Sequence, residues 1–173
     1  MSINLELPQC SQEKMRELLQ KQREFYFRLN HLEKHTRTAR KIGVKTCVKC
    51  ASCCWQNPCD LNREDLINIS EYLGYKNVKD FFKEKIVIQY YAQLKKYIIV
   101  PVRKGFKAGV FNLPENWFKL EPCVFLEKNL CTINDVKPKC GKDMNFWEDI
   151  DDISIGIFYS KEELTKILEE FDI

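Results

Sequence analysis

Four cysteines stand within eight residues of this chain, and this run constrains the fold more than any other feature. It reads Cys47-Val-Lys-Cys50-Ala-Ser-Cys53-Cys54. Two Cys-x-x-Cys units overlap at Cys50, and the turn within each unit lets both sulfurs reach one ion. Overlapping units are typical of thiolates that wrap an iron–sulfur cluster. The run therefore predicts a loop organised around a soft metal.

A second group of cysteines follows later in the chain. Cys123 and Cys131 flank a predicted hairpin, so we expect them to lie near each other at its base, with Cys140 close behind. Seven thiols exceed the four that one zinc ion or one cubane cluster needs, so two sites or one site with spare thiols both remain open. The predicted metal ligands are Cys47, Cys50, Cys53, Cys54, Cys123, Cys131 and Cys140.

The remaining cysteines and the two histidines are weaker candidates. Cysteine also packs well in cores, but the 47–54 loop is polar, and its neighbours Lys45 and Lys49 favour the thiolate form. Cys59 is close enough to join the site, whereas Cys10 is isolated and is interpreted as an ordinary thiol. His31 and His35 lie four residues apart on a predicted helix, and we interpret them as solvated helix residues rather than ligands.

Charge is unevenly distributed although the net charge is only +3. Residues 143–173 hold ten acidic side chains against two lysines, while a basic run without acids spans residues 34–49. The favoured interpretation of the run is a solvated face that the acidic tail balances. The alternative is a docking patch for an acidic partner or nucleic acid. No aromatic side chain interrupts it, so a base-stacking site is not indicated. We expect a protein partner and no nucleic acid, and the oligomeric state stays open.

The cysteines are expected to be reduced thiols. The first residues show no apolar signal-peptide core, and no apolar run approaches the length of a membrane span. Nine cysteines are an odd number, which disfavours a closed set of disulfides. These features predict a cytoplasmic protein without a membrane segment.

Helical periodicity and capping residues mark four segments. One helix is expected over residues 11–40, a second from the N-cap Asn62 to Gly74, a third over residues 77–85, and a last one after the capping box of Ser160 and Glu163. The predicted inner faces of the last three carry Leu66, Ile69, Tyr72, Leu73, Val78, Phe81, Phe82, Leu164, Ile167, Leu168 and Phe171.

Short apolar runs suggest strands between these helices. Residues 86–88 and 97–100 have strand composition, although the segment between them has a helical pattern. Residues 124–126 and 130–133 predict a hairpin, and Gly105 and Gly109 mark turns. We therefore predict a small, mainly helical α+β single domain over residues 1–173 with cysteine-rich metal-binding loops. Its parts are an N-terminal helix (11–40), a cysteine-cluster core (47–140) and an acidic C-terminal helical tail (143–173).

The ordered motifs resemble the YkgJ-type CxxCxxCC cysteine-cluster family of zinc- or iron-chelating proteins. Residues 47–54 carry its signature, and residues 61–66 look like its Leu-x-x-x-Asp-Ile helix start. Residues 123–126 are similar to its Cys-Pro-Phe-Leu element, and residues 131–140 to its Cys-x-Ile-Tyr…Arg-Pro…Cys element. The resemblance covers about residues 47–140.

The chain departs from the family pattern near its last cysteine. Asn134 stands where the family tends to have tyrosine, Lys137 where it has arginine, and Gly141 where an arginine often follows the cysteine. The spacing from Pro138 to Cys140 is one residue shorter than usual. The thiols themselves are intact.

The resemblance implies metal chelation more firmly than any reaction. The first hypothesis is thiolate-ligated iron, held as an iron–sulfur cluster, in electron transfer, metal delivery or an accessory role; zinc is the alternative metal. The second is a structural zinc module that presents the basic helix to a partner. Flagellin lysine N-methylase carries a similar cluster, so a component of a protein-modifying enzyme is the third. No glycine-rich S-adenosylmethionine loop is present, catalysis stays open, and no catalytic residue is predicted.

Overall fold

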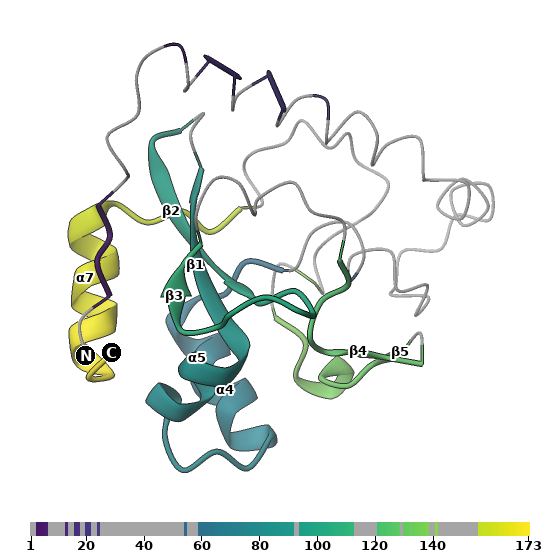
Figure 1. Ribbon diagram of the computed structural model, residues 1–173. Helices are drawn as coiled ribbons and strands as arrows, with labels where there is room; N and C mark the ends of the chain where they lie inside the picture. The colour runs from purple at the N-terminus through teal and green to yellow at the C-terminus, as the bar shows by residue number, and fades with distance from the viewer. Residues whose placement is uncertain are drawn as a thin grey trace.

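Helices pack around a small mixed β-sheet in the part of the chain that the structure describes. This computed structural model describes residues 3–6, 13, 16, 17, 20, 21, 24, 54, 59–91, 94–112, 121–128, 130–138, 141 and 156–173. Within them, helices α4, α5 and α7 adjoin a three-stranded sheet, and a two-stranded hairpin lies to one side (Figure 1). The fold class is α+β, which confirms the prediction.

Two short helices precede the sheet, and their caps form as the sequence predicts. Helix α4 (Arg63–Tyr72) begins with a capping box in which the Asp65 amide donates to Asn62 Oδ1 at 2.7 Å and the Asn62 amide donates to Asp65 Oδ2 at 3.0 Å. Gly74, at φ +76°, supplies the left-handed residue that ends it. Helix α5 (Val78–Lys85) begins after its N-cap Asn77. No described helix has the length and apolar composition that crossing a bilayer requires.

The inner faces of these helices match the predicted ones with one exception. Leu66 and Ile69 of α4 and Phe81 and Phe82 of α5 are fully buried. Tyr72 was expected among them but is 47% exposed. Its hydroxyl donates to Asp135 Oδ2 at 3.3 Å, because the phenol end finds a polar partner at the surface that the core does not offer.

The central sheet is a hairpin extended by one short parallel strand. Strand β1 (Ile86–Tyr91) pairs antiparallel with β2 (Lys96–Pro101), and β3 (Val110–Phe111) pairs parallel with β1. The helical pattern predicted between residues 88 and 97 is wrong for residues 89–91 and 96, which belong to the strands, and for residues 94–95, which form a turn. Cross-strand pairing overrides the local preference there.

Both faces of the hairpin are covered, which explains its nearly continuous apolar composition. Ile86, Ile88 and Ile99 enter the main core together with residues of α4, α5 and α7. Val87, Val100 and the alternate side chains point to the opposite face and form a second cluster. That cluster contains Val87, Ile98, Val100 and Val102, with Phe106, Ala108, Val110, Val124 and Phe158 packed against it.

The outer edge of β2 is closed by two segments that are distant in sequence. The Leu61 amide donates to the Ile99 carbonyl at 2.8 Å. Tyr97 and Tyr159 exchange two backbone hydrogen bonds, each 2.8 Å long, and the Tyr159 hydroxyl donates to the Leu61 carbonyl at 3.0 Å. These bonds satisfy edge groups that would otherwise stay open to pairing with another chain. They also fix the chain immediately after Cys59.

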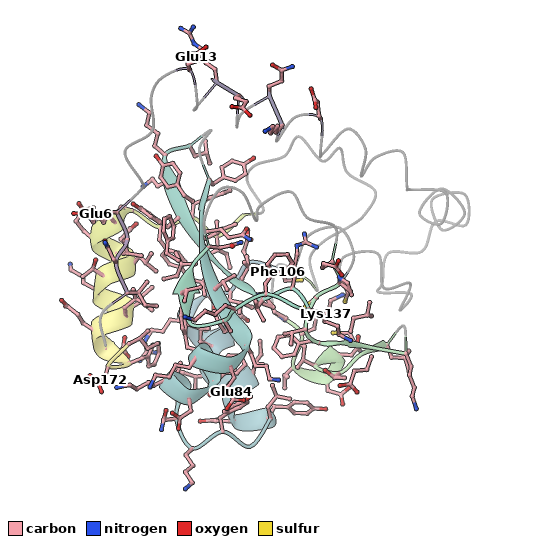
Figure 2. The ribbon with its side chains drawn as sticks, viewed as in Figure 1. Glu6, Glu13, Glu84, Phe106, Lys137 and Asp172 are labelled. Atoms are coloured by element: carbon pink, nitrogen blue, oxygen red, sulfur yellow. The ribbon has the colours of Figure 1, made fainter. Side chains whose placement is uncertain are left out.

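Helix α7 (Lys161–Glu170) and the residues after it form ion pairs with helices α4 and α5. The Ser160–Glu163 capping box forms as predicted, and Leu164 and Leu168 are buried. Glu170 pairs with Arg63 of α4, and Asp172, labelled in Figure 2, pairs with Lys79 of α5. The basic run at residues 34–49 lies outside the described residues, so the suggestion that the acidic tail balances it stays a prediction.

The remaining short elements lie in the second half of the chain, apart from scattered helical positions near the start. Strands β4 (Leu126–Glu127) and β5 (Leu130–Cys131) form the predicted hairpin with shorter strands, and the 3-10 helix η2 (Asn134–Val136) follows. Of the helix predicted over residues 11–40, the described positions are helical and exposed: Glu13, Arg16, Glu17, Gln20, Lys21 and Glu24. The rest of that helix lies outside the described residues.

The close approach of α5 to the sheet at Gly109 can be tested by substituting this glycine. A Cβ at Gly109 would lie 2.9 Å from the Lys83 Cα, whereas one at Gly105 would meet nothing within 4 Å. Both glycines have positive φ, so Gly109→Ala and Gly105→Ala share a left-handed strain of about 1–2 kcal/mol. We expect Gly109→Ala to cost about 1–3 kcal/mol more than Gly105→Ala in urea unfolding, because backbone must move. Equal losses would contradict the close approach.

Candidate metal centre

Cys123 lies between two chain segments and is hydrogen-bonded to the first cysteine group. Its amide donates to the Cys54 carbonyl at 2.7 Å. On the other side it pairs with Arg103 in an isolated antiparallel bridge, where the Val124 amide donates to the Val102 carbonyl at 2.9 Å. Successive amides of an extended segment point in opposite directions, which lets residues 122–124 contact both neighbours. Both cysteines are buried, with Cys54 5% and Cys123 4% exposed.

The β4–β5 hairpin determines where Cys131 lies relative to Cys123. The Leu126 amide donates to the Cys123 carbonyl at 3.0 Å, which closes a turn after Cys123. Cys131 is then directly opposite Leu126 in the hairpin register. The Thr132 amide donates to the Phe125 carbonyl at 2.8 Å and continues this pairing. The predicted hairpin therefore forms, with Cys131 opposite Leu126, three residues after Cys123.

Cys59 lies against the end of the second cysteine group. A Cβ added to Gly141 would lie 2.6 Å from Cys59 Sγ and 2.9 Å from Lys137 Cε. The glycine after Cys140 is therefore in close contact with the sulfur of Cys59 and with the Lys137 side chain. Gly141 is itself buried, so a larger side chain has no solvent route by which to avoid them. The family's arginine at this position has no room in this chain.

Two of the described cations are buried, one bridged to Cys123 and the other beside Gly141. Arg103 is 8% and Lys137 5% exposed, and the Arg103 Nη1 donates to the Glu121 carbonyl at 2.7 Å. Lysine and arginine are almost never this buried unless they are paired, because an isolated charge loses most of its solvation energy. Sequence reasoning did not single out Arg103, and it noted Lys137 only as a departure from the family.

An ionisable cluster adjoins Cys59 on its other side. Burial raises the pKa of the Asp60 carboxyl to about 6, and the hydrogen bond from the Ile157 amide, at 3.3 Å, opposes that rise. Burial also raises the pKa of the Tyr159 hydroxyl, with the carboxylates of Asp65 and Asp60 adding to the effect. Asp60 thus anchors residues 59–61 to residue 157. Sequence analysis did not identify it.

The described residues contain part of the predicted ligand set. Cys54, Cys123 and Cys131 are described, whereas Cys47, Cys50, Cys53, Cys140, Cys10, His31 and His35 lie outside the described residues. Among the described residues, no three cysteine, histidine or acidic side chains form a group that could hold a metal ion. The described donors fit a soft metal in kind, since they are cysteine sulfurs and two of the three residues, Cys54 and Cys123, are buried. The assignment of the seven ligands stays a prediction.

The family of this chain is shown by comparison with known protein families. Residues 46–166 match the family CxxCxxCC, described as "Putative zinc- or iron-chelating domain". The chain belongs to this CxxCxxCC family. The match continues beyond the motifs at residues 47–140 and includes most of α7. No curated protein and no solved structure matches the chain at a significant level.

The contact of Gly141 with Cys59 can be tested by combining substitutions at the two positions. We expect Gly141→Ala to destabilise the metal-free, reduced protein by about 1–3 kcal/mol, since the new methyl group overlaps Cys59 Sγ. Cys59→Ala removes that sulfur, so the double variant should lose less than the two single variants together. The measurement is the free energy of urea unfolding for all four proteins. Strict additivity would show that the two positions are not in contact.

Proposed function

We propose that this protein binds iron through cysteine thiolates, as an iron–sulfur cluster. Membership of a zinc- or iron-chelating family supports the binding of a metal. The observation that carries the proposal is the 2.7 Å hydrogen bond from the Cys123 amide to the Cys54 carbonyl, because it brings one residue of each cysteine group into contact. The proposed ligands are drawn from Cys47, Cys50, Cys53, Cys54, Cys123, Cys131 and Cys140.

The number and spacing of the thiols favour iron–sulfur chemistry over a single zinc ion. The overlapping Cys-x-x-Cys units are typical of cluster ligation, and seven thiols exceed a closed zinc site. When bound, a cluster supplies one-electron chemistry at a potential that nearby charges and solvent exposure adjust. Within this chain, the Cys54–Cys123 hydrogen bond and the hairpin would hold the ligand backbone.

Metal binding would also stabilise the fold. A centre that joins residues 47–54 to residues 123–140 connects segments far apart in sequence, and such binding energy adds to folding energy. We place this chemistry in the cytoplasm, where thiols stay reduced. The proposed roles are electron transfer, metal delivery or support of a modifying enzyme, each through a protein partner.

Zinc is the second candidate, because the family description includes it. Anaerobic purification followed by elemental and sulfide analysis separates the two metals. An iron–sulfur protein is brown, contains iron and acid-labile sulfide, and loses visible absorption on reduction. A zinc protein is colourless and contains stoichiometric zinc. Protein that retains neither metal under these conditions would contradict the proposal.

Single cysteine substitutions test the ligand set. We expect Cys54→Ser and Cys123→Ser to lower the metal retained per polypeptide at least tenfold, because serine is a poor donor for a soft metal. Cys10→Ser, the same change outside the resemblance, should retain the wild-type metal content. Circular dichroism shows whether each variant is folded before its metal is measured. Wild-type retention by Cys54→Ser or Cys123→Ser would remove that residue from the proposed ligands.

A further inference from the structure

Residues 3–6 lie against the main core as an extended segment, which we call the strap. Leu5 is buried and Ile3 packs against the same core cluster, whereas Asn4 and Glu6 are exposed. Successive side chains of an extended backbone point to opposite sides, so this alternation directs Ile3 and Leu5 inward together. Figure 1 shows the strap beside helix α7, whose buried side chains belong to that core cluster. The strap thus presents two apolar side chains, two residues apart, to the rest of the protein.

Two hydrogen bonds satisfy polar groups of the strap. The Tyr97 hydroxyl of β2 donates to the Leu5 carbonyl at 3.1 Å, and the Glu6 amide donates to Asn4 Oδ1 at 2.9 Å within the strap itself. Burial raises the pKa of the Tyr97 hydroxyl, so this group keeps its proton and remains a donor. Among the described residues, no backbone–backbone hydrogen bond joins the strap to the rest of the chain. The strap is therefore attached through side chains and is not a strand of the sheet.

The surface that receives Leu5 is fixed without the strap. Tyr97 is paired with Tyr90 across the central hairpin and exchanges backbone hydrogen bonds with Tyr159 on its other side. Its ring packs edge-on against Tyr90, with centroids 5.2 Å apart, and lies 6.0 Å from the ring of Phe111. Aromatic rings with one hydroxyl donor offer a large apolar area and a single directed polar contact. Such a surface matches an extended peptide that presents an apolar side chain and a carbonyl group.

Attachment of the strap is a balance between small free energies. Burial of the Leu5 side chain and the hydrogen bond from Tyr97 favour the attached state. Ordering the backbone of residues 3–6 opposes it by an amount of similar size. Segments with few buried contacts open locally while the rest of the fold stays intact. We therefore expect the strap to detach and rebind, which leaves its site open to another segment of the same pattern.

We propose that the surface beneath the strap is a docking site for an extended peptide of a partner protein, and that the strap occupies it as an intramolecular competitor. The peptide carries two apolar side chains two residues apart, with polar residues between and after them, as in Ile3-Asn4-Leu5-Glu6. The site recognises the second apolar residue by burial and its carbonyl through the Tyr97 hydroxyl. This inference is separate from the proposed function, since no proposed metal ligand takes part in it.

The test supplies the strap sequence as a separate molecule. The probe is a fluorescein-labelled peptide of residues 1–8, added to the full chain. Leu5→Ala in the protein weakens the strap, and Glu6→Ala changes an exposed side chain of the same strap as the matched control. A second peptide carries Leu5→Asp and should not bind, because its carboxylate would be buried. The readout is the Kd from fluorescence anisotropy, and circular dichroism shows whether each protein is folded.

The strength of peptide binding should follow the strength of the strap. We expect the Leu5→Ala protein to bind the peptide about tenfold tighter than the wild type, because a weaker competitor leaves more sites open. Glu6→Ala should match the wild type. Adding Tyr97→Phe to Leu5→Ala should weaken binding about 3- to 10-fold, because the peptide carbonyl loses its donor. If Leu5→Ala does not fold, Leu5→Val replaces it in the same comparison, with a gain of about threefold.

Several results would overturn this docking site. A folded Leu5→Ala protein that does not bind the peptide would show that the surface beneath the strap takes no ligand. Equal affinities of Leu5→Ala and Glu6→Ala would show that the strap does not compete. Equal binding of the Leu5→Asp peptide would show that the leucine is not recognised. Wild-type dimers that the peptide dissociates would assign the site to the strap of a second copy instead of a partner protein.

Discussion

The hydrogen bond from the Cys123 amide to the Cys54 carbonyl joins two segments that are far apart in the sequence, and the relative placement of these two described cysteines depends on it. Because Cys123 also pairs with Arg103, this one residue connects the first cysteine group to the end of the central hairpin. A backbone bond sets the distance between the two segments before any metal is considered. The side chains of a binding centre can then be arranged at low entropic cost.

Burial of positive charge is the second constraint. Arg103 and Lys137 are both almost fully enclosed near cysteine residues. Burying a charged side chain costs hydration energy that interactions within the fold must restore. Arg103 recovers part of it through the hydrogen bond that its Nη1 donates to the Glu121 carbonyl.

Local features of the fold were predictable because the interactions that produce them span only a few residues. The Asn62–Asp65 and Ser160–Glu163 capping boxes formed where the residue types indicated, as did the left-handed glycine after α4. The segment between the two strands of the central hairpin was misjudged, because its helical pattern yields to pairing with a partner strand. Tyr72 was misplaced for a related reason, since its hydroxyl bonds to a residue far along the chain. The metal chemistry was indicated by spacing alone, and the chain indeed belongs to a chelating family.

The sequence by itself determined the helix caps, the α+β class and the kind of metal donor, because cap geometry and thiol spacing act over a few bonds. Tertiary structure decided which distant groups meet: Cys54 with Cys123, and Cys59 with Gly141 and Lys137. It also decided that Lys137 is buried, although lysine is usually exposed. Such contacts depend on how strands and turns pack in three dimensions, and residue spacing along the chain carries no direct record of that packing.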